Sequence, residues 1–456
     1  PGVEERERAV AAALRDPRNA PAVKALLEAP EEFPVKLALI ESLSKALAEA
    51  HEGAEAFPAG PGGAGEGAAA QQSLLGHVYP LLEYFAGYVK SFAAGQPPFI
   101  ANCVCSLYGQ QFKALLRAHR GVEGLLASLH RHFLAENPQL WDARCLLKFV
   151  YYALESLTLN PSALGYFEYR KLVAAYEEAA LPFFLEQGTF LVKRLCGFVG
   201  GGADREALET LLLALQVLSR LLHFPFGLSY YEYSAESTSE DVTLVIFPDS
   251  YAPLMEDREL VRLLSQVFAA KLSKEISMET LRVFSRMASC RLSLFGDEAA
   301  KAAHRQEFLE LFPLLVHQSP LDDRGFQAEL IDYGLRCLFV FSWRFVAQGE
   351  ELTAAWRLCW QELGARVVQG SESLADPVLS RYLEYLKRAV DNGFGGGGEL
   401  AAAFLAGYCR HFFAQSTHAQ FFPAAFLTPK KFVNSVEKRF GAMRAVFQAS
   451  GAAGPG

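Results

Sequence analysis

The sequence predicts an all-α protein, an α-solenoid in which helical hairpins stack one on the next. Three observations predict this fold. Apolar residues recur at helical spacing along almost the whole chain, period-two alternation is nearly absent, and helix-breaking residues divide the chain at short intervals. The chain has 456 residues, which is too long for one compact core of ordinary size. A repeat array accounts for the pattern and for the length.

The expected helices are roughly 12 to 22 residues long and are joined by short links. Apolar residues at helical spacing mark one early helix, residues 35–48, and a later one that runs from Leu208 to Leu222. Pro and Gly end such segments because Pro lacks the backbone N–H and Gly favours non-helical conformations. The breaks, in chain order, are Asp16-Pro17, Pro30, Pro97-Pro98, Asn137-Pro138, Asn160-Pro161, 200–202, Pro248, Pro253, Ser319-Pro320 and 393–398.

The spacing of these breaks predicts a repeat of two helices. In the clearer stretches consecutive breaks lie about 20 residues apart, so a hairpin takes roughly 40 to 47 residues, the period of HEAT and armadillo arrays. Segment 145–159 is apolar on more than one face, as expected of a helix packed both by its hairpin partner and by the next repeat. We therefore expect one continuous helical-repeat array over residues 1–456, and we expect the chain to be a fragment of a longer protein.

Three segments interrupt the helical pattern. Residues 51–70 are rich in Gly, Ala and Pro and predict a flexible insertion, and residues 393–398 predict a flexible Gly-rich linker. Residues 229–245 differ, because they are acidic and long for a connection between helices. The acidic side chains of this loop are either solvated charges or contacts for a basic partner. The candidate partner-contact residues are Glu236, Glu240 and Asp241.

Composition excludes several classes of partner. The net charge is −8, which disfavours direct nucleic-acid binding, since affinity for phosphate backbones depends on clustered Lys and Arg. An acidic surface suits a basic protein partner instead. No run of about 18 uncharged apolar residues is present, so we expect no membrane insertion and a soluble, intracellular protein.

The cysteines and histidines predict no metal site. Eight cysteines are scattered through apolar stretches without a CxxC pair, which is typical of buried free thiols in a reducing compartment. His130 and His132 are one residue apart, so on a helix they point in different directions and cannot chelate one ion together. The same argument applies to Cys103 and Cys105, which are also one residue apart. The eight are Cys103, Cys105, Cys145, Cys196, Cys290, Cys337, Cys359 and Cys409.

No catalytic motif is present. The sequence lacks a Gly-x-Ser-x-Gly elbow, a P-loop, a Rossmann fingerprint, HExxH and the kinase motifs. Arg410 and His411 follow Cys409, but they match none of these arrangements. The glycines of 393–398 follow a helix and lack Lys-Ser/Thr, so they do not predict a phosphate cradle. We expect no enzyme activity, no catalytic or cofactor-binding residues and no cofactor.

Three stretches carry a family resemblance. Residues 217–226, VLSRLLHFPF, end a helix and lead into the acidic Ser/Thr loop 234–241, which is followed by VIFPDSY at 245–251. MASCRLSLF follows at 287–295. This order resembles the importin-β superfamily of nuclear transport receptors, in particular the exportin-7 (Ran-binding protein 16/17) subfamily, with exportin-4 the next most similar. Weaker similarity covers residues 35–48, 81–116 and 141–157.

The resemblance implies a function that needs no active site. A receptor of this superfamily is a curved stack of HEAT hairpins whose N-terminal repeats bind Ran-GTP and whose concave surface holds protein cargo. An exportin binds cargo better when Ran-GTP is present, so each ligand raises the affinity for the other by the same factor. The implied partners are Ran-GTP, protein cargo and the FG-repeat proteins of the nuclear pore, and the implied location is the nucleus and the cytoplasm. A generic HEAT or armadillo scaffold or adaptor is the alternative.

Overall fold

The structure, a computed structural model, is mainly helical in the part of the chain that it describes. Every regular element in the described part is an α-helix or a short 3-10 helix, which confirms the predicted all-α fold. The described residues are 122–134, 138–157, 166–199, 204–223, 247–340, 350–372, 376–391 and 397–413, together with several positions between 105 and 116. The predicted insertion at 51–70 and the acidic loop at 229–245 both lie outside the described residues. After this loop the described part of the chain resumes at residue 247.

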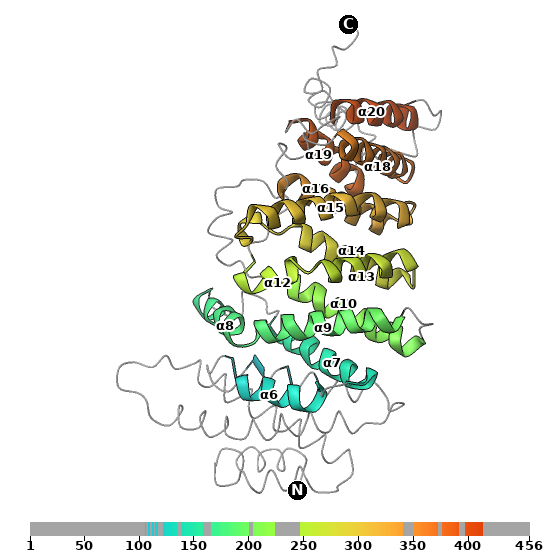
Figure 1. Ribbon diagram of the computed structural model, residues 1–456. Helices are drawn as coiled ribbons and strands as arrows, with labels where there is room; N and C mark the ends of the chain where they lie inside the picture. Colours follow the sequence, from blue (N-terminus) through green and yellow to red (C-terminus); the bar gives the residue numbers. More distant parts are fainter. Residues whose placement is uncertain are drawn as a thin grey trace, which may run out of the picture. The chain divides into compact units, whose positions relative to one another are not determined.

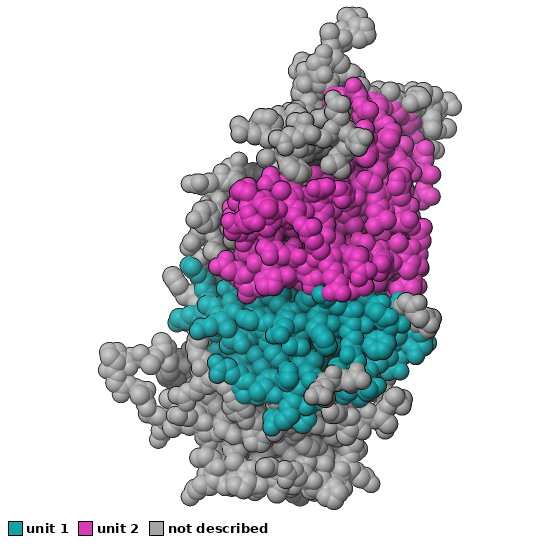
Figure 2. Space-filling view, viewed as in Figure 1, with its two compact units in different colours: residues 1–224 teal, residues 225–456 magenta. Residues whose placement is uncertain are grey.

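The chain divides into two compact units, Pro1–Phe224 and Pro225–Gly456, which are coloured teal and magenta in Figure 2. Each unit has its own buried apolar residues and its own packed helices. The continuity of the array over residues 1–456 stays a prediction.

The described part of the first unit contains two helical hairpins and one further helix. α6 packs against α7, and α9 packs against α10 (Figure 1). α7 and α10, the second helices of the two hairpins, lie side by side, and α8 packs on α9. The bounds are α6 Val122–Phe133, α7 Leu140–Leu157, α8 Tyr166–Ala179, α9 Leu181–Val199 and α10 Arg205–His223.

The core of the first unit forms where α7 meets its neighbours. α7 contacts α6, α9 and α10, so it buries residues on several faces, among them Cys145, Phe149 and Leu154. This confirms the prediction made for segment 145–159 over its described residues, 145–157. α10 buries one broad apolar face that includes Leu211, Leu215, Leu218 and Leu222 at helical spacing.

The second unit is a two-layer stack of hairpins. The hairpins α13/α14, α15/α16 and α18/α19 each pack internally. One layer contains α13, α15, α18 and α20, and the other contains α14, α16 and α19, with neighbours packed in that order (Figure 1). The bounds are η2 Asp249–Tyr251, α12 Ala252–Met255, α13 Arg258–Ala270, α14 Lys274–Ala288, η3 Leu292–Leu294, α15 Glu298–Gln318, α16 Arg324–Val340, α18 Glu350–Gln369, α19 Pro377–Asp391 and α20 Gly397–Phe413.

Side-chain caps define where several of these helices begin. The Asp257 carboxylate accepts a hydrogen bond from the Leu260 N–H at 2.9 Å, which caps α13, and the Ser273 hydroxyl accepts one from Ile276 at 3.1 Å, which caps α14. Such caps satisfy N–H groups that have no partner inside the helix. α13 ends at Ala270, and the next residue, Lys271, has a left-handed φ of 51° that turns the chain toward α14.

Most described breaks fall where the sequence predicts them. α7 begins just after Asn137-Pro138, α10 begins just after the glycines at 200–202, and α15 ends directly before Ser319-Pro320. Pro253 is different, because it lies in the first turn of α12, where a missing N–H costs nothing. The predicted linker 393–398 is shorter than expected, since α20 already begins at Gly397.

Aromatic side chains fill the space between the layers of the second unit. Phe312 of α15 stacks on Trp356 and Trp360 of α18, with ring centroids 4.3 and 5.3 Å away. Trp360 stacks in turn on Tyr385 of α19 at 3.4 Å. Close approach of α16 to this cluster requires a glycine at 334, because a Cβ there would overlap the Trp360 ring.

A proline inside α15 changes the hydrogen bonding of this core. Pro313 has no N–H to donate to the carbonyl of Leu309, four residues earlier. Trp356 of α18 takes its place, because its Nε1–H donates to the Leu309 carbonyl oxygen at 2.8 Å. The proline therefore frees an acceptor that ties α15 to the next hairpin.

Candidate protein-interaction surface

Charged side chains follow the second helices of the hairpins in each unit. The second helices of successive hairpins lie side by side. Charged side chains at the edge of the core on one helix therefore lie close to charged side chains on the next helix. We call these sets the unit 1 row, on α7 and α10, and the unit 2 row, on α14, α16 and α19. The unit 1 row comprises Arg144, Glu155, Glu206, Glu209 and Arg220, and the unit 2 row comprises Glu279, Arg282, Arg286, Glu329, Asp332, Arg336, Arg381 and Glu384.

At one end of the unit 1 row, a single arginine joins α7 to α10. Arg144 lies 3.9 Å from a carboxylate oxygen of Glu206 and 3.3 Å from one of Glu209. Glu209 also accepts a hydrogen bond from Arg205, at 2.8 Å. The Arg205 hydrogen bond, with the nearby positive charges, lowers the pKa of Glu209. The carboxylate is therefore held in its charged form.

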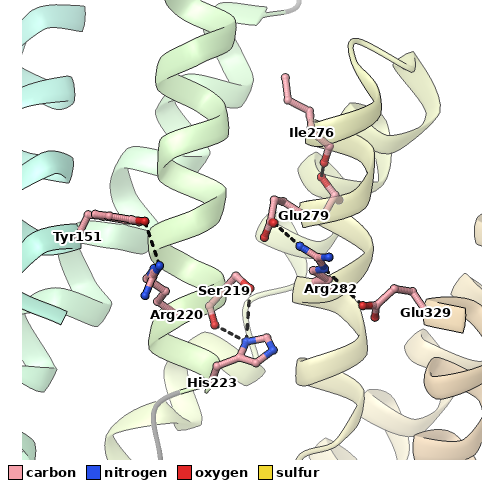
Figure 3. Close-up of polar contacts among 9 residues, drawn as sticks. Tyr151, Ser219, Arg220, His223, Ile276, Glu279, Arg282 and Glu329 are labelled. Atoms are coloured by element: carbon pink, nitrogen blue, oxygen red, sulfur yellow. Dashed lines mark hydrogen bonds and ion pairs between the residues drawn. The ribbon is translucent and has the colours of Figure 1, made fainter. Parts of the chain in front are cut away.

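At the other end of the unit 1 row, Arg220 of α10 makes three contacts with α7. Its guanidinium donates to the Tyr151 hydroxyl at 2.9 Å (Figure 3) and lies 4.4 Å from the centre of the Tyr151 ring. It also forms an ion pair with Glu155. A cation over a phenol ring is attracted by the negative face of the ring. Next to it, His223 Nδ1 lies 2.5 Å from the Ser219 carbonyl, which can only accept, so Nδ1 carries the hydrogen.

The unit 2 row joins three helices in the same manner. Arg282 of α14 donates to Glu279 at 2.7 Å and to Glu329 of α16 at 3.3 Å (Figure 3). Arg381 of α19 donates to Asp332 of α16 at 2.9 Å and to Glu384 at 3.2 Å. Each arginine thus pairs with one acid on its own helix and with one on the neighbouring helix.

The middle of the unit 2 row is less exposed than its flanks. Burial raises the pKa of Glu329, and it lowers the pKa of Arg336. Burial, and then the positive charge of Arg336, lower the pKa of Arg286 to about 10. At neutral pH both arginines remain cations. The row therefore combines half-exposed ion pairs with partly desolvated charge.

A separate set of contacts holds the starts of the second helices in unit 2. Arg324 at the start of α16 pairs with Asp376, donates to Gln327 at 2.6 Å, and donates to the carbonyl oxygen of Val367 at 3.2 Å. Asp376 itself accepts from the Leu379 N–H at 2.9 Å and caps α19. Arg324 therefore connects α16, α18 and α19 and fixes the spacing of the unit 2 row.

One groove lies between α18 and α20, beside α19. Its volume is about 590 Å³, and its lining mixes apolar side chains such as Val368 and Phe404 with the polar side chains of Gln361, Gln369 and His411. His411 is the described member of the Cys409, Arg410 and His411 stretch, and the side chains of the other two lie outside the described residues. The lining brings together no nucleophile with a base.

The described cysteines have the environment that the sequence predicts. Cys105, Cys145, Cys196, Cys290, Cys337 and Cys359 are free and buried. Burial raises the pKa of Cys196 and of Cys290 to about 12 and that of Cys359 to about 11, so these groups are thiols at neutral pH. The Cys103 side chain and that of the last cysteine lie outside the description.

The histidines and acids form no metal site in the part of the chain that the structure describes. His130 of α6 is exposed and His132 is half-exposed. Among the described residues, no three His, Cys, Asp or Glu side chains lie close enough to hold a metal ion. Within the same ranges, no helix is both long and apolar enough to cross a bilayer.

The sequence-based site and the charged rows do not coincide. The predicted contact residues Glu236, Glu240 and Asp241 lie outside the described residues. The two rows were not predicted, because the pairing of Arg282 with Glu329 depends on which helices stack. The available signal was the shared spacing of charges at 279, 282 and 286 and at 329, 332 and 336, which places each set along one stripe of a helix.

Comparisons with known proteins identify no family for this chain. No family model matches the chain, and no curated protein matches its sequence. The chain is similar to a circular tandem repeat protein with novel repeat topology, at 14% identity and a TM-score of 0.20, over 97% of this chain and 98% of that one. It is also similar to the NOT1 superfamily homology domain from Chaetomium thermophilum, at 15% identity and a TM-score of 0.25, over 98% of each chain. Likenesses this low carry no argument, so the all-α hairpin-repeat fold rests on the packing of the chain's own helices.

Proposed function

We propose that this chain is a helical-repeat receptor that binds other proteins, and specifically a nuclear transport receptor of the exportin type that binds Ran-GTP and protein cargo. The observation that supports protein binding is the pair of charged rows on side-by-side second helices. The support for Ran and for transport is the sequence resemblance in residues 217–295.

The rows suit a protein partner for a physical reason. Exposed ion pairs contribute little to stability, about 0 to 1 kcal/mol each, so a partner can compete for their charges at small cost to the fold. Helices that lie side by side also present several such pairs over an extended surface. A protein partner can contact a surface of this length, whereas a small molecule needs only a compact pocket. The proposed mechanism is coupling of two binding reactions, with GTP hydrolysis carried out by Ran.

A generic helical scaffold or adaptor is the second candidate function. The same hairpin packing and the same rows support it, because neither feature requires that the partner protein carry a bound nucleotide. The two candidates differ in one property, since only a transport receptor distinguishes Ran-GTP from Ran-GDP.

The decisive experiment measures binding of the purified chain to Ran loaded with a non-hydrolysable GTP analogue and to Ran-GDP, at physiological salt. We expect a clear preference for the GTP form. Circular dichroism of the same sample checks that the chain is folded. Equal or absent binding by a folded chain would contradict the transport-receptor proposal and leave the scaffold as the function.

A further inference from the structure

The groove between α18 and α20 contains aromatic rings but no acidic or strongly basic side chain. Its described lining includes no Asp, Glu, Lys or Arg. Tyr382 of α19 and Phe404 of α20 are buried there, with ring centroids 4.6 Å apart. The Tyr382 hydroxyl already donates to the carbonyl oxygen of Trp360. Tyr382 and Phe404 therefore offer apolar ring surface to a molecule in the groove.

Two glycines shape this groove. A Cβ at Gly364 of α18 would overlap the Tyr382 hydroxyl, so the glycine lets Tyr382 of α19 approach closely. A Cβ at Gly407 of α20 would meet no atom within 4 Å, so α20 presents bare backbone to open space here. Leu358 of α18 lies one turn before Gln361 and is 63% exposed, which extends the apolar surface beyond the groove. The groove therefore has room for bulky apolar side chains from another segment.

Polar side chains lie along the same groove. Gln361 and Gln369 of α18 each carry an amide that both donates and accepts hydrogen bonds, and His411 of α20 carries an imidazole. A helix satisfies most of its own backbone N–H and C=O groups, whereas a non-helical segment must find other partners for them. The groove therefore suits a peptide segment that is uncharged, non-helical and rich in bulky apolar side chains.

The chain itself carries such a sequence directly after α20. α20 ends at Phe413, two residues after His411. Residues 414–429 contain no Asp, Glu, Lys or Arg, and within them FFPAAFL at 421–427 supplies three Phe and one Leu. A proline follows Phe422, and the residue before a proline is disfavoured in a helical conformation. The sequence of 421–427 therefore matches the groove in charge and in apolar content.

The connection from α20 is long enough for this sequence to reach the groove. The lining contributed by α20 runs from Ala403 to His411, which is about 12 Å of helix. The chain from Phe413 to Phe421 can span up to about 26 Å at about 3.3 Å per residue. A short tether also raises the local concentration of a segment at its site to about millimolar. Residues 421–427 therefore have an advantage over any free peptide.

We propose that residues 421–427 bind in the groove between α18 and α20, with their Phe side chains against Tyr382 and Phe404. The chain's own segment then closes the groove, and a partner protein that uses this surface must first displace it. This inference goes beyond the proposed function, because it depends on neither Ran nor cargo.

The test removes the apolar side chains of the segment and measures whether the groove becomes free. The full chain is compared with its triple variant, which carries Phe421→Ser, Phe422→Ser and Phe426→Ser. A fluorescently labelled peptide of residues 419–431 is titrated against both, and binding is followed by fluorescence anisotropy. We expect the peptide to bind the triple variant about tenfold more tightly or more, because it no longer competes with a tethered copy. Equal affinity for both chains, or no binding to the triple variant, would overturn the proposal.

A groove variant and its control locate the site. Added to the triple variant, Gly407→Phe fills the groove and should abolish peptide binding. Gly197→Phe on α9 is the matched control, because a Cβ at Gly197 also meets no atom within 4 Å, and it should leave the affinity unchanged. Gly407→Leu replaces Gly407→Phe if circular dichroism shows that the latter does not fold. Peptide binding that survives this filling would contradict the groove as the site.

Photo-crosslinking separates a contact within one chain from a contact between two. In the full chain, p-benzoylphenylalanine replaces Phe422, and mass spectrometry maps its crosslinks after irradiation. We expect crosslinks to α18 or α20 within the same chain. Crosslinks between two chains would assign the groove to a second copy, and the absence of crosslinks to both helices would place the segment elsewhere. Either result would overturn the proposal, and neither depends on the outcome of the Ran-binding experiment.

Discussion

Glycine 334 on α16 shows how a single missing methyl group controls the core of the second unit. A Cβ at this position would overlap the indole of Trp360, so Gly334→Ala forces the ring or the helix to move. We expect the variant to lower the free energy of unfolding by about 1 to 3 kcal/mol, as overpacking does in other cores. Thermal and denaturant unfolding measure the change. Gly197→Ala on α9 meets no atom within 4 Å and should be neutral or stabilising.

His304 of α15 should give the stability of the second unit a pH dependence. Its ring is packed between Phe295 and Phe308, with centroids 4.8 and 4.6 Å away. Burial lowers its pKa to about 4 from 6.5, while the backbone of Met255 and of Met287 opposes the shift. The unfolded chain therefore takes up a proton as pH falls below 6.5, before the folded chain does. Stability from this group is complete above pH 6.5 and is lost between about pH 6.5 and 4.

The expected loss is about 3 to 4 kcal/mol, because the pKa falls from 6.5 in the unfolded chain to about 4 in the folded one, and each tenfold difference in proton affinity is worth about 1.4 kcal/mol. Denaturant unfolding at a series of pH values measures it. His304→Leu cannot be protonated, so its stability should vary less over the same range. An equal pH dependence in the variant would assign the effect to other groups.

The acidic residues predicted from the sequence lead to a separate test. Glu236, Glu240 and Asp241 lie outside the described residues, so their role as a partner contact stays a prediction. Replacing all three with Ala should weaken binding to Ran-GTP or to cargo, because acidic side chains attract a basic partner. Titration of both partners against the triple variant checks this. Unchanged affinity for both would identify these residues as solvated loop charges.

At the scale of helices, the contacts between neighbouring helices differ in how much they contribute to the free energy of unfolding. Arg282 is 44% exposed, so Arg282→Ala should lower the free energy of unfolding by less than about 1 kcal/mol, and less still at high salt. Arg324→Ala removes the partner of Asp376 and one donor to the Val367 carbonyl, and it should cost about 1 to 3 kcal/mol. Unfolding at low and high salt compares the two. A larger loss for the Arg282 variant would contradict this order.

The sequence predicts the helices well because their signals are local. The apolar spacing of segment 208–222 predicts α10, and Asn137-Pro138 and Ser319-Pro320 predict breaks, since each effect acts within one or two turns. Pro313 has the same local signal as the other prolines, but it lies inside α15 because Trp356 of another helix satisfies the carbonyl it frees. The unit 2 row was missed for the same reason. Its pairs between helices join residues more than 40 positions apart, such as Arg282 with Glu329, and only the stacking of hairpins brings them together.

At the scale of the whole molecule, stability comes from contacts between neighbouring hairpins. In the second unit the aromatic contacts run from Phe312 through Trp360 to Tyr385, and Tyr382 continues them to Phe404 of α20 at 4.6 Å. Repeat arrays are stabilised by such nearest-neighbour interfaces. Damage at one interface should therefore affect the hairpins on both sides of it first.

A double-mutant cycle tests this coupling between α15 and α18. Trp356→Phe keeps a large apolar ring but removes the N–H that the Leu309 carbonyl accepts, so it should cost about 1 to 3 kcal/mol. Pro313→Ala supplies a backbone N–H within α15 for the same carbonyl. Combined with Pro313→Ala, the Trp356→Phe change should cost less than it does alone. Additive effects of the two changes, measured by denaturant unfolding, would contradict the exchange of donors.

Pro313 also has a mechanical consequence. An interior proline makes a helix prone to bend, because one hydrogen bond that would stiffen it is missing. In α15 the carbonyl oxygen left free at this point accepts a hydrogen bond from Trp356 of α18 instead. The bending resistance of α15 is thus a property of two hairpins together, and loss of that one contact would turn the middle of α15 into a hinge.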